Sequence, residues 1–362
     1  VGEVIARVNA ASQSSAFGQI ELTTSTTTIN NQNFAINHLP TANALTVASQ
    51  VNPGGSIKVT VPALTGSDPE DGDLSGTNLK SKIMINTLPG TATGVLYYND
   101  IAVTVGQVIP AYNPALLKVD PATGPQVMTF SFSQIDSAGK MSAFPALVTL
   151  PFTTVNIGGI VLLDANGLMG SPANTVDGTG TNAGGINAVL YANNTVLAVQ
   201  PVTNNGLFNF TDRDGGNYSV MITTNTATVG QPIPAVSLPN GWVSTGEFVG
   251  GISTPGNDLT VDGKLEIGLV TGNVNNAKFG IERLPTAIAV STTVPVPVAG
   301  TLFTLSGSTG NQPIPTAIDP EDGALAAGKT IVIVTLPTNT NLLYNGTPVT
   351  AGQVIPNFVP AQ

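Results

Sequence analysis

The sequence reads FAINHLPTA from Phe34 to Ala42 and FGIERLPTA from Phe279 to Ala287, 245 positions later. The similarity continues downstream in further paired segments, namely SDPEDG (Ser67–Gly72) with IDPEDG (Ile318–Gly323) and VLYYNDIAVTVGQVIP (Val95–Pro110) with NLLYNGTPVTAGQVIP (Asn341–Pro356). Self-similarity at a long fixed spacing is typical of modular repeat proteins. The chain therefore contains two copies of one module, which we name module A.

A second module, named B, lies upstream of each copy. GQIEL (Gly18–Leu22) precedes the first copy and GKLEI (Gly263–Ile267) the second, again 245 positions apart, and Gly2-Glu3-Val4 resembles Gly246-Glu247-Phe248. We expect residues 1–33 to be the C-terminal part of a B module, 34–154 a module A, 155–278 a complete B module and 279–362 the start of a second module A. The second A copy stops at the counterpart of Ala115, as a window cut from a longer array would.

Apolar residues within the modules recur with period two, which predicts half-buried strands. The clearest runs are Ile57/Val59/Val61, Met128/Phe130/Phe132 and Tyr218/Val220/Ile222, the last alternating with Ser219 and Met221. Pairs such as Asn99-Asp100 and Asn345-Gly346 separate the runs and favour hairpin turns. The sequence predicts an all-β fold of tandem Ig-like β-sandwich modules arranged end to end as a rod.

The composition bounds the class of protein. Charged residues make up 9% of the chain, against roughly 25% in ordinary soluble domains. The net charge of −10 argues against nucleic acid as a partner, and no apolar run is long enough to insert into a membrane. The sequence contains no Cys, so disulfides and thiolate metal sites are excluded. A polar, weakly charged, acidic surface favours an extracellular location at a cell surface.

Module B resembles a known family. VNIGGIVLLD (Val155–Asp164), the Gly/Asn-rich run Ala165–Tyr191 and GLFNFTDRDGGNYSV (Gly206–Val220) are similar to the B-type repeat domains of bacterial surface adhesins, relatives of the collagen-adhesin B domain. Among these, the segments most resemble the giant gliding-motility adhesins of Bacteroidota, of the SprB type, which the type IX system exports. Module A resembles the cadherin-like and Ig-like modules of the same proteins. The resemblance implies surface exposure and adhesion or extension.

Many collagen-adhesin-type B domains carry an isopeptide bond from a Lys on the first strand. The corresponding segment here, Gly158–Leu163, contains no Lys, and the nearest downstream is Lys264. We therefore expect no isopeptide bond in module B.

Calcium is the sharpest functional hypothesis for module B. Asp164 and Asn166 open a long Gly/Asn loop that becomes acidic again at Asp177, and calcium prefers six to eight oxygen ligands. The resemblance implies calcium on loops of this kind. The alternative is that Asp and Asn are present because they form turns. The same choice exists for Asp212 and Asp214, where Arg213 could supply the counter-charge.

Module A offers a second candidate calcium site. Asp68, Glu70, Asp71 and Asp73 crowd one loop of the first copy, and Asp319, Glu321 and Asp322 repeat them in the second, with Ala324 in place of the fourth acid. Carboxylates at this density repel one another unless water or a cation screens them. A turn led by Pro explains DPEDG equally well.

Catalysis is poorly supported. The only His is His38, and the second copy has Arg283 there, so we expect His38 to be a solvated polar residue rather than a catalytic one. Gly-rich stretches lack the GK[ST] of a phosphate loop. Trp242, the only Trp, is expected to cover the core of module B from an edge rather than to stack on a sugar.

We therefore expect a non-enzymatic repeat segment of a cell-surface adhesin that acts as a stalk in surface attachment or gliding. Its expected partners are neighbouring modules of the same long chain and surface glycans or proteins. One alternative is a self-assembling filament or surface-layer subunit completed by strand addition. Another is a set of accessory modules of a secreted enzyme.

Overall fold

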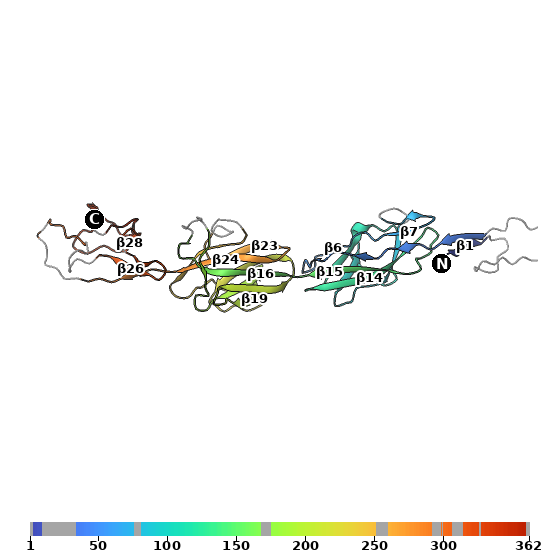
Figure 1. Cartoon of the computed structure of the whole chain (residues 1–362), viewed down its shortest axis with the longest axis horizontal. Helices are drawn as coiled ribbons and strands as arrows, with labels where there is room; N and C mark the ends of the chain where they lie inside the picture. Colours follow the sequence, from blue (N-terminus) through green and yellow to red (C-terminus); the bar gives the residue numbers. More distant parts are fainter. Residues whose placement is uncertain are drawn as a thin grey trace, which may run out of the picture. The chain divides into compact units, whose positions relative to one another are not determined.

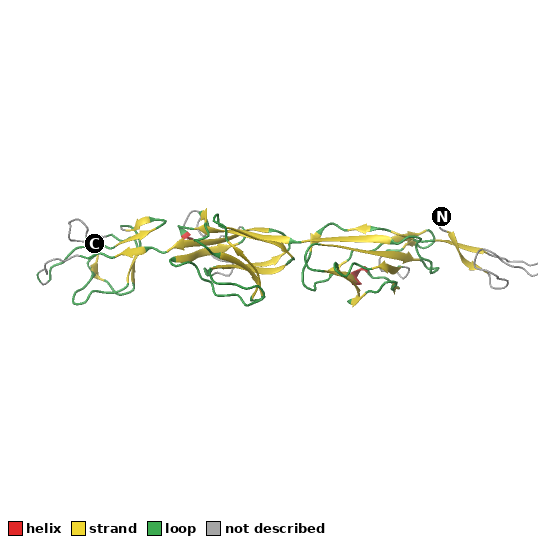
Figure 2. Ribbon diagram, turned by 90° about the horizontal axis from the view of Figure 1, so that it is seen from below, coloured by secondary structure: helices red, strands yellow, loops and turns green. Residues whose placement is uncertain are grey.

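The computed structural model describes residues 3–8, 34–75, 81–167, 175–250, 260–291, 298, 300–305, 314–325 and 327–359. These residues form β-strands and turns with only short 3-10 segments, such as η1 (Pro114–Leu116), so the all-β prediction is confirmed (Figures 1 and 2). No helix in this part of the chain has the length and apolar character needed to cross a membrane. Two compact units are present: Val1–Ile157 with Phe210–Asn217 and Gly268–Val274, and the remainder.

Module A of unit 1 is a sandwich of two main sheets. The first has the order β11-β10-β13-β6 and contains β6 (Val59–Thr60), β10 (Gly94–Tyr98), β11 (Ile101–Ala102) and β13 (Leu117–Pro121). The second has the order β12-β9-β14-β15-β4, with β5 also on β15, and contains β4 (Leu45–Thr46), β5 (Gln50–Val51), β9 (Lys82–Thr87), β12 (Val108–Ile109), β14 (Gln126–Ile135) and β15 (Ala146–Thr153).

Smaller sheets complete unit 1. One contains β3 (Thr41–Ala42), β7 (Gly66–Asp68) and β8 (Gly72–Asp73), and another pairs β1 (Glu3–Val8) with β2 (Phe34–His38).

The core of module A lies between the two main sheets and follows the period-two pattern. Met128, Phe130 and Phe132 of β14 are fully buried, as their alternation predicts. Ile83 and Ile85 of β9 join them in the same apolar cluster. A glycine is required where the sheets approach: a Cβ on Gly94 would lie 2.7 Å from the Met128 Cε and 2.9 Å from the Pro121 Cα.

The strand predicted from Ile57, Val59 and Val61 is only partly confirmed, because β6 is short and Val61, although buried, follows it. β6 begins at Val59, and Ile57 lies outside it with 58% of its surface exposed. The Ile57 N–H instead donates to the Gly54 carbonyl over 3.4 Å. Gly54 and Gly55 both adopt positive φ, and such a tight turn ends the extended backbone before Ile57.

The edge of the second sheet is parallel, whereas its other pairs are antiparallel. β4 and β5, near the start of the module, both run parallel to β15, its last strand. The Val47 N–H donates to the Thr149 carbonyl over 3.0 Å, and the Asn52 N–H to the Thr153 carbonyl over 2.8 Å. A single residue, Thr154, separates β15 from the next strand.

Module B is a second pair of sheets. One has the order β17-β16-β24-β22, with β20 also on β16, and contains β16 (Val155–Leu163), β17 (Thr179–Gly180), β20 (Leu207–Arg213), β22 (Trp242–Phe248) and β24 (Val274–Arg283). The other has the order β19-β18-β21-β23 and contains β18 (Asn187–Ala192), β19 (Thr195–Pro201), β21 (Gly216–Thr223) and β23 (Lys264–Val270).

β21 is buried more completely than its alternation predicts. Val220 and Ile222 are fully buried as expected, but Met221, expected on the solvent side, is also fully buried. Met221 packs in a separate apolar cluster with Val189 and Val196, which Ala227, Ile233 and Val236 cover. The loop that contains these last residues therefore covers the outer face of the sheet.

The second module A copy repeats the pairings of the first. Its strands are β25 (Thr286–Ile288), β26 (Thr316–Asp319), β27 (Gly323–Leu325), β28 (Ile331–Ile333), β29 (Leu343–Tyr344), β30 (Thr347–Pro348) and β31 (Gln353–Ile355). Each of its three small sheets matches one group of first-copy strands residue by residue: β25-β26-β27 matches β3-β7-β8, β28-β31 matches β9-β12, and β29-β30 matches β10-β11.

Individual bonds recur as well. The Tyr98 hydroxyl accepts from the Asn113 N–H over 3.0 Å, and the Tyr344 hydroxyl accepts from the Val359 N–H over 2.9 Å. Both copies turn through left-handed residues, at Asn99-Asp100 and at Asn345-Gly346, as the sequence predicts.

The sheets of the second copy are less complete than those of the first. β9 lies between β12 and β14, whereas β28 pairs only with β31 in the part of the chain that the structure describes. Val332 and Val334 are 54% and 76% exposed. No segment of this sequence after β31 matches β13, β14 or β15.

The N-terminal strand does not repeat its sequence match. β1 pairs with β2 so that Glu3 lies opposite His38, whereas Glu247 of β22 lies opposite Phe279 of β24. The counterpart of Phe279 is Phe34, so the two pairings differ in register. The similarity between Gly2-Glu3-Val4 and Gly246-Glu247-Phe248 is therefore not carried into the strand pairing.

Candidate functional site at the repeated acidic turn

The DPEDG segment forms the same turn in both copies. The Asp68 Oδ1 accepts from the N–H groups of Glu70 and Asp71, over 2.9 and 3.0 Å. The Asp319 Oδ1 accepts from Glu321 and Asp322 over 2.8 and 2.9 Å. A carboxylate that binds the next two or three backbone N–H groups is a local reason for Asp at the start of a turn.

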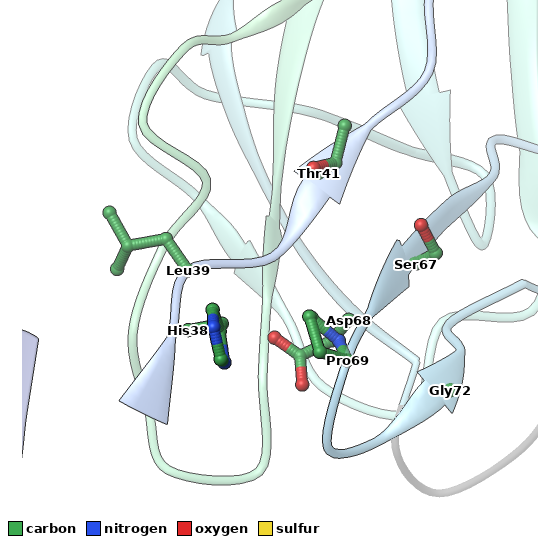
Figure 3. A pocket seen from close by; sticks show the side chains of 7 residues that line it. All are labelled: His38, Leu39, Thr41, Ser67, Asp68, Pro69 and Gly72. Carbon is green, nitrogen blue, oxygen red and sulfur yellow. The ribbon is translucent and has the colours of Figure 1, made fainter. Parts of the chain in front are cut away.

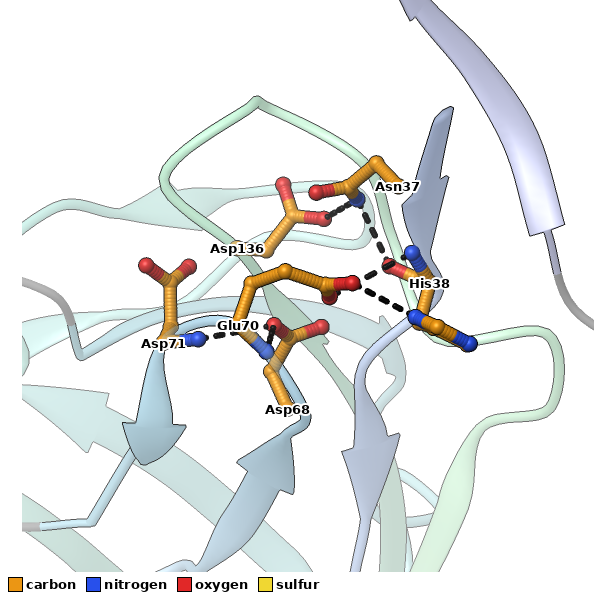
Figure 4. Close-up of polar contacts among 6 residues, drawn as sticks. All are labelled: Asn37, His38, Asp68, Glu70, Asp71 and Asp136. Atoms are coloured by element: carbon orange, nitrogen blue, oxygen red, sulfur yellow. Dashed lines mark hydrogen bonds and ion pairs between the residues drawn. The ribbon is translucent and has the colours of Figure 1, made fainter. Parts of the chain in front are cut away.

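A basic residue, His38 or Arg283, faces the second acid of each turn. The His38 Nδ1 lies 2.5 Å from the Glu70 Oε1, and the Arg283 Nε donates to the Glu321 Oε1 over 3.0 Å (Figure 4 shows the first copy). Hydrogen bonding to His38 holds the pKa of Glu70 below its ordinary value. His38 is half-exposed, as a solvated residue would be, but its ring also contacts the Glu70 carboxylate of the acidic turn, a role that the sequence did not predict. The replacement of His by Arg between the copies was the available signal, because both can be cationic.

The turn that follows β14, which begins at Asp136, makes contacts with both β2 and the acidic turn of the first copy. The Asn37 Nδ2 donates to the buried Asp136 Oδ2 over 2.6 Å, and the Asp71 carboxylate accepts from the N–H and the hydroxyl of Ser137, both over 2.7 Å (Figure 4 shows the first of these bonds). Sequence reasoning did not assign these roles to Asn37, Asp136 or Ser137, since the partners lie far apart in the chain. The acidic turn is thus fixed by protein donors on two sides.

A pocket of about 440 Å³ opens beside this turn (Figure 3). It lies between the end of β2 with β3 on one side and the start of the turn on the other. Its lining residues are His38, Leu39, Thr41, Ser67, Asp68, Pro69 and Gly72.

The predicted calcium ligands of module A are occupied by protein donors to different extents. Glu70 binds His38, Asp71 binds Ser137, and Asp73 accepts from the Ser75 N–H over 2.8 Å. Hydrogen bonding to the Ser75 side chain, and secondly to this N–H, lowers the pKa of Asp73. Two buried oxygens among these ligands, the Asp68 Oδ2 and the Glu321 Oε2, have no hydrogen-bond partner. Within the described residues, no three His or acidic side chains are gathered as a metal ion requires. Calcium at this turn stays a prediction.

The predicted site in module B has a buried carboxylate at its centre. Asp164 is fully buried at the end of β16, and its Oδ2 accepts from the Thr245 hydroxyl over 2.6 Å. Its Oδ1 has no hydrogen-bond partner. Burial raises the pKa of Asp164, and the nearby charge of Asp177 adds to the increase. Asn166 is exposed, and the loop between residues 168 and 174 lies outside the described residues, so calcium here also stays a prediction.

The remaining acids and Trp242 have structural partners. Within unit 1, the Asp214 Oδ1 accepts from the Gly124 N–H over 3.0 Å, and the Asp212 Oδ1 accepts from the Thr154 hydroxyl over 3.4 Å. The Trp242 ring lies under the Arg283 guanidinium, 5.4 Å from the ring centroid. Trp242 thus supports the residue that binds the acidic turn of the second copy.

Comparisons with known proteins give a limited result. No model of a protein family matches the sequence, and no curated protein matches it. Among solved structures, the chain is similar to the major pilin subunit BcpA of Bacillus cereus, with 14% identity over 55% of this chain and 65% of the pilin, and a TM-score of 0.25. A single-residue variant of the same pilin gives 13% identity over 57% and 71%, with a TM-score of 0.26. A likeness at this level does not extend to function.

Proposed function

We propose that this chain is a non-catalytic structural segment of an extracellular surface protein, built from alternating A and B modules that act as a stalk. One observation carries the proposal: the strands and single bonds of the first module A recur with the same pairing in the second. Repetition of a self-contained sandwich serves length and spacing, since each copy brings its own sheets. An active site needs no such repetition.

The surface chemistry agrees with this role. The acids of the repeated turns are held by backbone N–H groups and by basic side chains, His38 in the first copy and Arg283 and Lys329 in the second. These contacts fix the turns rather than offering free reactive groups. The low content of charged residues fits a protein that works outside the cell. Because module B resembles gliding adhesins of the SprB type, we propose more specifically that the stalk serves surface attachment or gliding.

A self-assembling filament is the second candidate, and the free edge of β28 favours it. An edge strand with unpaired N–H and C=O groups can accept a further strand from another chain. Ile331 and Ile333 are only half-buried there, whereas their counterparts Ile83 and Ile85, on β9 with β14 paired beside it, are fully buried. A strand of fitting sequence added at β28 would bury them.

Two measurements test these proposals. Antibodies raised against the chain should label intact source cells, and labelling only after lysis contradicts the surface location. Sedimentation of the purified chain over a wide concentration range separates the two candidates. A stalk segment stays monomeric, whereas ordered polymers that disappear when Val332 is replaced by Pro support the filament, because Pro removes an N–H from β28.

A further inference from the structure

The parallel strands at the edge of module A determine how a pulling force would load the module. β4 and β5 begin the module's second sheet, β15 ends it, and the three strands point the same way. In a parallel pair, the chain enters one strand and leaves the other at opposite ends. A pull on the two ends of the module therefore slides β15 along β4 and β5, and the bonds between them are loaded together.

We propose that β4, β5 and β15 form a shear clamp that carries tension through module A. The inference deepens the proposed stalk function and rests on it for its role in the cell. Its backbone bonds include those from Val47 to Thr149, over 3.0 Å, and from Asn52 to Thr153, over 2.8 Å. An antiparallel pair of terminal strands would instead open one bond at a time from its end.

Side chains resist the same sliding motion. Leu45 and Val47 pack against the core cluster that contains Val148, Leu150 and Phe152 of β15. Moving β4 along β15 would draw these apolar side chains out of their packed positions, which costs free energy roughly in proportion to the apolar surface exposed. Backbone bonds and packing thus oppose the same displacement.

The far end of the clamp is anchored by Asn52, which is fully buried. Its Nδ2 donates to the Ala122 and Gly124 carbonyls over 2.7 and 2.8 Å, and its Oδ1 accepts from the Gly54 N–H over 3.0 Å. Because Thr154 alone joins β15 to β16, the covalent path beyond the clamp has almost no slack.

The test pulls the full chain in single-molecule force spectroscopy in two directions. The protein has no Cys, so two introduced cysteines are the only thiols to which the pulling handles can attach. Ala44 is exposed and directly precedes β4, so attachment at Ala44→Cys and Thr154→Cys loads the clamp in shear. Attachment at Ala44→Cys and Phe144→Cys pulls β4 and β15 from the same end, so their bonds break one after another. Phe144 is 83% exposed, and its replacement by Cys should therefore leave the fold intact. Rupture in shear should need a several-fold higher force, and equal forces overturn the proposal.

A matched pair of Pro variants checks which bonds carry the load. Val47→Pro removes the donor to Thr149, and Val103→Pro removes the donor to the Leu96 carbonyl, a bond of 2.9 Å outside the clamp. Both variants should lower the equilibrium stability. Unfolding of the segment between positions 44 and 154 releases roughly 350 Å of chain, and only Val47→Pro should lower the force at which this event occurs in shear. An equal fall in both variants overturns the clamp. Neither result bears on the surface location, which the antibody labelling tests.

Discussion

Gly66→Ala should destabilise unit 1, although alanine occupies the equivalent position of the second module A copy. A Cβ on Gly66 would lie 2.5 Å from the Thr41 carbonyl oxygen and still closer to the Gln134 Cγ. Its counterpart, Ala317, tolerates the same neighbouring strand, so Gln134 of β14 is the decisive obstacle. Gln134 is fully buried and cannot swing away into solvent.

Forcing a methyl group into such a site costs about 1–3 kcal/mol. For a unit of this size, that corresponds to a fall in Tm of about 2–12 °C. Calorimetry of the full chain measures it directly.

Two control variants separate a clash with Gln134 from a general difference between glycine and alanine. Ala317→Gly should cost only about 0.5–1 kcal/mol, because it adds backbone freedom without relieving a contact. Adding Gln134→Ala to Gly66→Ala should recover part of the loss, so that the two changes are not additive. If Gly66→Ala leaves the Tm unchanged, or if the double variant shows simple additivity, the contact between Gly66 and Gln134 is not what requires glycine.

The polar groups of the chain give four further predictions. Asn52→Ala should lower the free energy of unfolding of unit 1 by about 1–3 kcal/mol, since it removes a fully buried amide that binds the part-buried carbonyls of Ala122 and Gly124. A loss below about 1 kcal/mol in denaturant titration contradicts this. His38→Ala should raise the pKa of Glu70 toward its ordinary value of 4.5, whereas His38→Arg should keep that pKa low; NMR titration of the carboxyl group measures both. The stability that this contact contributes is present above pH 4.5 and is lost as the pH falls through the lowered pKa of Glu70. Burial raises the pKa of Glu282, and the charge of Asp319 adds to the increase. Unit 2 should therefore lose stability as the pH rises from 4.5 through the raised pKa, and Glu282→Gln should make the plot of stability against pH flatter. The same slope in the variant and in the unmodified protein would refute this prediction. If calcium binds, adding it at 100 times its Kd should stabilise the chain by about 2.7 kcal/mol relative to EDTA, and identical melting midpoints defeat that hypothesis.

Local patterns predicted the parts of the fold that local geometry controls. The alternation of Met128, Phe130 and Phe132 gives the buried face of β14, because successive strand residues point to opposite sides. The paired segments of the two copies predict the same strand pairing, and the structure has it. Met221 was placed on the wrong side because a distant loop covers its sheet, and alternation carries no information on such a cover.

The candidate site was predictable only in part for the same reason. The acids of DPEDG stand out in the sequence, and their role as a turn was one of the two interpretations. Their partners come from other strands: His38 lies 32 positions from Glu70, and Ser137 lies 66 positions from Asp71. Only a second copy with Arg283 in place of His38 hinted that a cation belongs there. Asn37 and Asp136 gave no local signal, since their contact depends on the folded sheets.

The close packing at Gly94 also bears on misfolding. Tandem copies of one module risk exchanging strands, which is a characteristic failure of repeat proteins. In the second copy Thr340 stands where the first has Gly94, whose missing side chain makes room for Met128 and Pro121. If the first copy's β13 and β14 were taken up by the second, they would collide with the threonine. We therefore expect the divergence at this position to disfavour an exchange of strands between the two copies while the chain folds.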